Sequence, residues 1–224
     1  MQTADHAHTT DADTAGDALL IWQDVREQAD WADACPTVAG PVRGTRDGVA
    51  DYAAASGPTR GENRARRLGA AWQQAYADAR AGHALDFARL AAWHETVLGH
   101  PQHAFRTGAA YAKRGRERYG LHADTAHRFA SCLAQSRDPV LPLPARAARL
   151  YLDVAFFHPF DDGNARAALL ALGHLLATED VVLGWITPLT AARYAHDPGG
   201  ATELARTVHL LISRTHGTRS PTGR

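Results

Sequence analysis

A short stretch in the last third of the chain combines side chains that can do acid–base and phosphate chemistry. Its residues are His158, Pro159, Phe160, Asp161, Asp162, Gly163, Asn164, Ala165 and Arg166. A loop that only joins two helices needs turn residues. It does not need an imidazole, two carboxylates, a carboxamide and a guanidinium so close together. The stretch therefore predicts a functional site.

The order of these residues predicts a phosphate site with a base beside it. Gly163 lets the backbone approach a ligand, and the amides that open a following helix are unpaired donors at the positive end of its dipole. Asp162 can coordinate a magnesium ion that bridges phosphate oxygens, and Arg166 can clamp those oxygens. His158 is placed to act as general base for a hydroxyl nucleophile. Phe160 should anchor the loop to the core.

Each of these residues also has a structural interpretation. His158 alone could be a histidine packed between helices, Asp162 could be a helix N-cap, and Arg166 could be a solvated helix charge. The concentration of functional groups favours the site. Asp162 can serve as cap and as metal ligand at once.

The stretch lies between two of the helices that the apolar periodicity predicts. Helices are expected from Asp17 and over residues 49–56, 62–80, 85–98, 121–135, 145–157 and from 163–166 through 176. Proline disfavours helix at the preceding residue, so the break falls at His158. Residues 105–119 predict an irregular loop or a short hairpin. Strand patterns are otherwise almost absent, which indicates an all-α domain with one small β-hairpin.

The composition limits the partners and the compartment. The 224 residues hold 24 Lys and Arg against 24 Asp and Glu, so no global basic field favours nucleic acid. No apolar stretch reaches the roughly 18 residues that cross a bilayer, and residues 1–16 are polar and acidic, unlike a secretory signal. Cys35 and Cys132 fit neither a disulfide framework nor a CxxC metal pair. We expect a cytoplasmic protein without nucleic-acid or membrane partners.

Four segments are expected along the chain. Residues 1–16 and 214–224 are predicted as disordered tails, because they lack apolar periodicity. Residues 17–84 are predicted as an N-terminal helical extension. Residues 85–213 are predicted as the helical core that carries the site.

The site sequence resembles the signature of the Fic family, His-x-Phe-x-Asp/Glu-Gly-Asn-Gly-Arg-x-x-Arg. The matching residues are His158, Phe160, Asp162, Gly163, Asn164 and Arg166. Upstream, residues 92–99 and the run Phe105-Arg106-Thr107-Gly108 resemble a helix of Fic domains and the entry to their flap hairpin. The resemblance covers about residues 85–183 and leaves the first 80 residues unplaced.

This resemblance implies a Fic-like helical core with a small β-hairpin flap, and a transferase that moves AMP from ATP onto a hydroxyl. The acceptor is expected to be a protein. By analogy, His158 deprotonates that hydroxyl, Asp162 holds Mg²⁺, and Arg166 contacts the phosphates of the co-substrate ATP. Gly163, Asn164 and Ala165 supply the anion hole. The flap residues expected to pair with the target backbone are Thr107, Gly108, Ala109, Ala110 and Tyr111.

Two positions depart from the family pattern. Ala165 replaces the second glycine, and Leu169 replaces the last arginine. In the family, that arginine holds the γ-phosphate and pairs with the glutamate of an autoinhibitory Ser/Thr-x-x-x-Glu-Gly/Asn segment. The nearest candidate here, Thr59-Arg60-Gly61-Glu62-Asn63, is one residue short. We therefore expect no autoinhibition of this type.

Other functions stay open at this point. The Doc branch of the superfamily binds ATP reversed, transfers the γ-phosphate, and has a single arginine followed by Thr-Ala-Leu, comparable with Ala167-Ala168-Leu169. Its Ala-Asn-Lys differs from Gly163-Asn164-Ala165, and its flap lacks the Phe-Arg-Thr entry, so we favour nucleotide transfer. A small-molecule acceptor and a catalytically inactive binding or regulatory module are further alternatives. The sequence does not predict the acceptor, the nucleotide base, the oligomeric state or the regulation.

Overall fold

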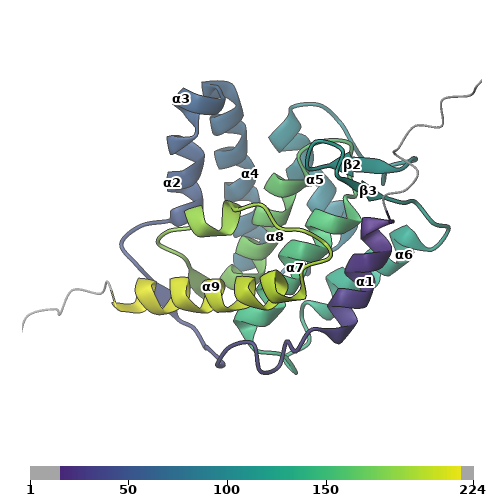
Figure 1. Ribbon diagram of the computed structural model, residues 1–224. Coiled ribbons are helices and arrows are strands. Elements are labelled where there is room, and N and C mark those ends of the chain that lie inside the picture. The colour runs from purple at the N-terminus through teal and green to yellow at the C-terminus, as the bar shows by residue number, and fades with distance from the viewer. Residues whose placement is uncertain (1–15, 218–224) are drawn as a thin grey trace, which may run out of the picture.

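The structure, a computed structural model, describes residues 16–217. Helices dominate it, and the strands form two short pairs (Figure 1). The elements are α1 (Ala18–Gln28), β1 (Val42–Arg43), α2 (Gly48–Ala55), α3 (Gly57–Arg60), α4 (Glu62–Arg80), α5 (Phe87–Leu98), β2 (Ala110–Ala112), β3 (Glu117–Tyr119), α6 (Thr125–Gln135), α7 (Leu143–Phe157), α8 (Asn164–Thr178), β4 (Val181–Val182), the 3₁₀ helix η2 (Thr187–Thr190) and α9 (Pro198–Gly217). The predicted helical class and the hairpin are confirmed.

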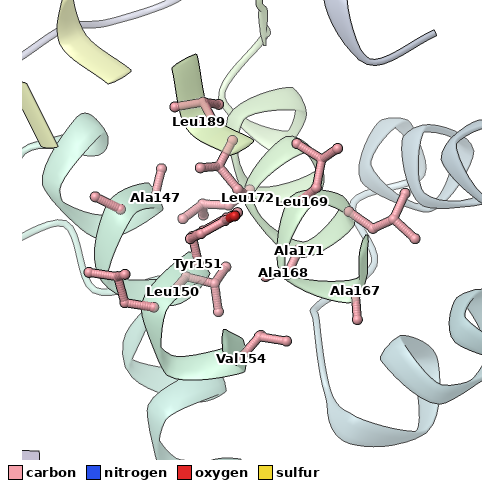
Figure 2. Close-up of a cluster of buried hydrophobic side chains, with 14 of the residues drawn as sticks. Ala147, Leu150, Tyr151, Val154, Ala167, Ala168, Leu169, Ala171, Leu172 and Leu189 are labelled. Carbon is pink, nitrogen blue, oxygen red and sulfur yellow. The ribbon is translucent and has the colours of Figure 1, made fainter. Parts of the chain in front are cut away.

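Helices α7 and α8, which flank the site, form the centre of the fold. They pack on each other, with α4 against α8 and α9 against α7 (Figure 1). Every residue of α8 from Ala167 to Ala177 is buried. Figure 2 shows alanines of both helices interleaved with larger side chains such as Leu150 and Leu172. Because the side chains are small, the backbones of α7 and α8 pack closely. The loop between the two helices is therefore anchored at both ends to a rigid helix pair.

Helices α4 and α5 run antiparallel beside this centre. Trp93 Nε1 donates to Asp78 Oδ2 at 2.8 Å, and Thr96 Oγ1 donates to Gln74 Oε1 at 2.9 Å. The C-terminal end of α5 therefore lies beside the first turns of α4. That end is also next to the loop before α8.

The elements before residue 179 mostly follow the sequence pattern, whereas α3, η2 and α9 are not among the expected helices. Helix α4 covers 62–80 as predicted, whereas α6 begins only at Thr125, whose hydroxyl accepts from the N–H of His122 at 2.8 Å. The parallel pair β1–β4, Val42 opposite Val181, was not predicted, because two-residue strands carry no periodicity.

The C-terminal tail also differs from the prediction. Helix α9 continues to Gly217, so the C-terminal tail predicted from residue 214 starts inside a helix. The rest of both predicted tails lies outside the described residues. Within residues 16–217, no helix is long and apolar enough to span a bilayer.

Candidate active site

His158 ends α7 in a conformation that points its ring into the site. Its backbone is left-handed, with φ 50° and ψ 55°, which is uncommon for a residue other than glycine. Its Nδ1 lies 3.1 Å from the carbonyl oxygen of Ala155. Because a carbonyl oxygen only accepts, Nδ1 carries the proton in the neutral ring. Nε2 therefore holds the lone pair that a general base needs.

The surroundings of His158 keep this ring neutral. The imidazole stacks on the ring of Tyr119 in β3, with centroids 5.0 Å apart. Burial is the largest cause that lowers the pKa of His158, and the nearby cations Arg106 and Lys113 lower it further, whereas the bond to Ala155 opposes them. The pKa lies below its usual value of 6.5. At neutral pH the ring is therefore an unprotonated base.

Gly163 starts α8 and leaves donors free at its N-terminus. The N–H groups of Arg166 and Ala167 both donate to the carbonyl of Gly163, at 2.9 and 3.0 Å. Within the described part of the chain, the N–H groups of Asn164 and Ala165 have no partner. These two amides lie at the positive end of the helix dipole, which is the geometry that binds an anion. The methyl group of Ala165 leaves its amide free.

Asn164 braces the loop with its side chain. Its Oδ1 accepts from the N–H of Phe160 at 3.0 Å, and its Nδ2 donates to the carbonyl of Phe160 at 2.7 Å. Phe160 is fully buried, as predicted for the residue that anchors the loop. Only the backbone amide of Asn164 is thus available to a ligand, while its carboxamide fixes the shape of the loop.

His94 of α5 supports the same loop from the other side. It is fully buried, stacks on Phe160 with centroids 3.8 Å apart, and its Nε2 lies 2.7 Å from the carbonyl oxygen of Asp162. Burial lowers its pKa to about 4, so Nε2–H donates from a neutral ring. A Cβ on Gly163 would lie 2.7 Å from this Nε2, and φ there is +79°. Sequence reasoning did not predict this role, because no spacing rule links residues 94 and 162.

Asp162 is exposed at the mouth of the loop. Its Oδ1 accepts from the N–H of Gly163 at 2.6 Å, and its Oδ2 lies 3.3 Å from Arg166 Nη2. The N-cap of α8 is Gly163, without a side-chain cap, so the helix-cap interpretation of Asp162 is wrong.

The donor set suits magnesium brought by a nucleotide. In residues 16–217, no group of three or more His, Cys, Asp and Glu side chains is placed to hold a metal ion. Mg²⁺ is commonly held by one or two carboxylates, with water and phosphate oxygens completing its coordination. A single exposed carboxylate at Asp162 fits that pattern.

Arg106 ties the hairpin to the loop of His158. Its N–H donates to the carbonyl of Pro159 at 2.9 Å. Its buried guanidinium donates to the carbonyls of Gly108 and, at 2.6 Å, of Gly120, which lie on the two sides of the hairpin. The sequence pointed to Arg106 only as part of a resemblance, without a role.

The predicted flap residues lie on the outer side of this hairpin. Residues 107–109 are exposed, and Tyr111 is 56% exposed. Strand β2 pairs with β3 on one side, and among the described residues no strand covers its other edge. The hairpin therefore offers a free backbone edge.

A cavity of about 310 Å³ joins the base to the free amides. Its lining includes His158, Asn164, Ala165, Tyr151, Lys113 and Arg193. The structure thus brings His158, Asn164, Ala165 and Lys113 of the hairpin to one cavity, whereas Asp162, Arg166 and the predicted flap residues 107–111 do not line it. His174 lies elsewhere: it packs on Trp93, and its Nε2 is 3.1 Å from the carbonyl oxygen of His83, so it is a packing residue.

Comparison with known proteins agrees with this arrangement. Residues 84–176 match the model of the family described as Fic/DOC. A search of curated proteins found no match. The crystal structure of a Fic-domain-containing signaling protein from Bacteroides thetaiotaomicron is 16% identical, covering 72% of this chain and 75% of that one, with a TM-score of 0.50. The structure of IbpAFic2 covalently tethered to Cdc42 is 12% identical, covering 88% and 70%, with a TM-score of 0.53. The fold is that of Fic domains.

Proposed function

Because residues 84–176 form a domain of the Fic/DOC family, we propose that the chain is a Fic-type transferase. It moves a phosphate-linked group, AMP in our proposal, from a nucleotide to a hydroxyl of an acceptor. One observation carries this proposal. His158, whose Nε2 has no partner among the described residues, lines the same cavity as Asn164 and Ala165, whose amides are unpaired.

The geometry supports a direct transfer in one step. The acceptor hydroxyl gives its proton to Nε2 of His158, and its oxygen attacks the α-phosphorus of ATP. The bond from that phosphorus to the bridging oxygen breaks, and pyrophosphate leaves. The amides of Asn164 and Ala165, with the guanidinium of Arg166, stabilise the negative charge on the transferred phosphate. Asp162 would hold magnesium, which neutralises phosphate charge when bound.

A protein acceptor is supported by the hairpin. The free edge of β2 can pair with an extended segment of another chain, which is a common mode of peptide recognition. Residues Thr107 to Tyr111 form the approach to that edge. The similar IbpAFic2 structure is tethered to Cdc42, which also supports a protein acceptor here.

Transfer of the γ-phosphate, as in a Doc-like kinase, is the second candidate. The observation that favours it is the burial of Leu169, which is 3% exposed and gives α8 no second arginine. The presence of His158 and Asp162 together beside the unpaired amides of α8 argues against an inactive module.

Labelled ATP distinguishes these functions. The purified chain is incubated with cell lysate and ATP labelled at either the α- or the γ-phosphate, with His158→Asn as control. Label from the α-phosphate only, with a mass shift of AMP on the acceptor, supports our proposal. Label from the γ-phosphate only identifies a kinase. ATP binding without any transfer identifies a regulatory module.

A further inference from the structure

Two arginines bind neighbouring carbonyls at the C-terminal end of α5. Arg166 Nη1 lies 3.4 Å from the carbonyl oxygen of Val97, and Arg67 Nη1 donates to that of Leu98. Cations are favourable there because the last carbonyls of a helix carry its negative dipole end. The guanidinium of Arg67, on α4, is thereby placed near that of Arg166, on α8.

Arg64 continues the face of α4 that carries Arg67. Residues 64, 67, 71, 74 and 78 share one helical stripe, and Gln74 and Asp78 of that stripe bond to α5. The two helices are antiparallel, so α5 ends beside Arg67. Arg64 stands one helical turn before Arg67 on this face of α4, beyond the point where α5 ends, and it is exposed. Arg60 ends α3, which packs against α4.

The four arginines named above form a cluster. Its positive charge is larger than the negative charge of the carboxylates that pair with it. Burial is the largest cause that lowers the pKa of Arg166, and the charge of Arg64 comes next, with Arg60 adding to it and Asp162 opposing. In the part of the chain that the structure describes, Arg166 pairs with Asp162, whereas neither Arg60 nor Arg64 forms an ion pair with a carboxylate. An excess of positive guanidinium groups beside the unpaired amides at the start of α8 favours the binding of a ligand with several negative charges.

Helix α8 itself does not supply a second phosphate ligand. Leu169 belongs to the core with Leu172 and Ala168 (Figure 2). We propose that Arg64, with Arg60 beside it, binds the terminal phosphates of the nucleotide in place of the arginine that α8 lacks. The inference rests on the proposed function and adds residues of the N-terminal helices to the same site.

Four variants of exposed arginines test this, all in a His158→Asn background that prevents turnover. Arg64→Ala and the double variant with Arg60→Ala remove the proposed ligands. Arg66→Ala is the matched control: Arg66 is an exposed arginine on the same helix, but it bonds to Asn63 and lines a hollow between α2 and α4. The affinities of Mg–ATP and of AMP are measured by calorimetry, and unfolding curves check the fold.

We expect Arg64→Ala to weaken ATP binding roughly tenfold or more, the scale of a charge-assisted hydrogen bond, and to leave AMP binding unchanged. Arg64→Lys should recover part of the loss, and Arg66→Ala should bind as the parent does. Equal ATP affinity in Arg64→Ala, in the double variant and in the parent overturns the inference and leaves the proposed function intact. A parallel loss of AMP affinity also overturns it, since the nucleoside end then lies at α4. A parent that binds neither nucleotide refutes the proposed function together with the inference.

Discussion

At the scale of single residues, the backbone at the end of α7 sets the tautomer of His158 on which its proposed role as a base depends. The left-handed turn at its C-terminus bends the ring back to the carbonyl of Ala155, one turn earlier in the helix. That bond selects the tautomer with a free Nε2. The sequence predicted the base, but not the bond that orients it, because the left-handed conformation cannot be read from a His-Pro pair.

Replacing His158 should stop transfer without unfolding the chain. We expect His158→Asn to reduce the rate by about 10²–10⁴-fold, because a general base contributes that much and little to ground-state affinity. Asparagine accepts the left-handed conformation better than alanine does, so the fold should be retained. Transfer rates and nucleotide affinities measure the two effects. A rate above roughly a tenth of the parent's would refute the assignment of the base.

The pH profile should report the same residue. Since burial lowers the pKa of His158 below 6.5, the base is neutral above that pH and becomes protonated below its own pKa. We expect kcat/KM to be level near neutrality and to fall about tenfold per pH unit on the acid side. Initial rates across the acid range measure this limb. An acid limb centred above 6.5 would contradict the assignment.

At the scale of elements, the start of α8 depends on the contact between Gly163 and His94. Gly163→Ala should lower the free energy of unfolding by about 2–4 kcal/mol, from left-handed strain plus the collision with His94, and should slow transfer by moving the amides. Gly82→Ala is the matched control, because φ is +72° there and nothing lies within 4 Å of an added Cβ.

The control isolates the contact from the backbone strain. Gly82→Ala should cost only the strain, about 1–2 kcal/mol, and leave the transfer rate unchanged. Denaturant unfolding and initial rates of both variants give the comparison. Equal losses in the two variants would mean that the contact with His94 does not hold the loop.

Leu169 shows how a position of the motif has become part of the core. It is 3% exposed, so Leu169→Arg would place an unpaired charge among apolar side chains. We expect a loss of about 3–5 kcal/mol in the free energy of unfolding. Leu169→Met, which keeps the volume, should cost less than about 1.5 kcal/mol. Denaturation of both variants tests this, and an unaltered stability of Leu169→Arg would show that the site can open there.

The elements around the site were largely predictable, and their contacts were not. Apolar spacing located α4, α5, α7 and α8, because their buried apolar side chains recur at helical intervals. The roles of His94 and Arg106 depend on contacts with residues that lie far away in the chain, and periodicity says nothing about these. The predicted cap at Asp162 failed for a local reason, since Gly163 takes the cap position.

At the scale of the whole molecule, the N-terminal residues belong to the same core as residues 84–176, which match the family model. Arg26 of α1 forms an ion pair with the buried Asp153 of α7 at 2.7 Å. Asp17 accepts from the N–H of Gly120 at 2.9 Å and so fixes the base of the hairpin. Helix α4 packs on α8. Residues before 84 therefore contribute to the structure around the site, although the family model matches only residues 84–176.

Two buried histidines should make the stability of the whole molecule depend on pH. Burial lowers the pKa values of His94 and His174 from 6.5 to about 4. Between these values the unfolded chain binds protons that the folded chain excludes, so stability is full above pH 6.5 and falls as the pH drops toward 4. Each histidine should contribute a loss of roughly 3 kcal/mol over that window.

A variant that cannot titrate separates this effect from acid denaturation in general. His174→Gln keeps a donor for the carbonyl of His83 but has no proton to gain. Asp17 and Asp78 have pKa values below 3.8, so their contribution is lost only at lower pH. Urea unfolding from about pH 7 to about pH 4.5 should show a slope in His174→Gln that is distinctly shallower than in the parent. Identical slopes would mean that His174 is protonated in the folded protein and that the interior around α8 admits charge.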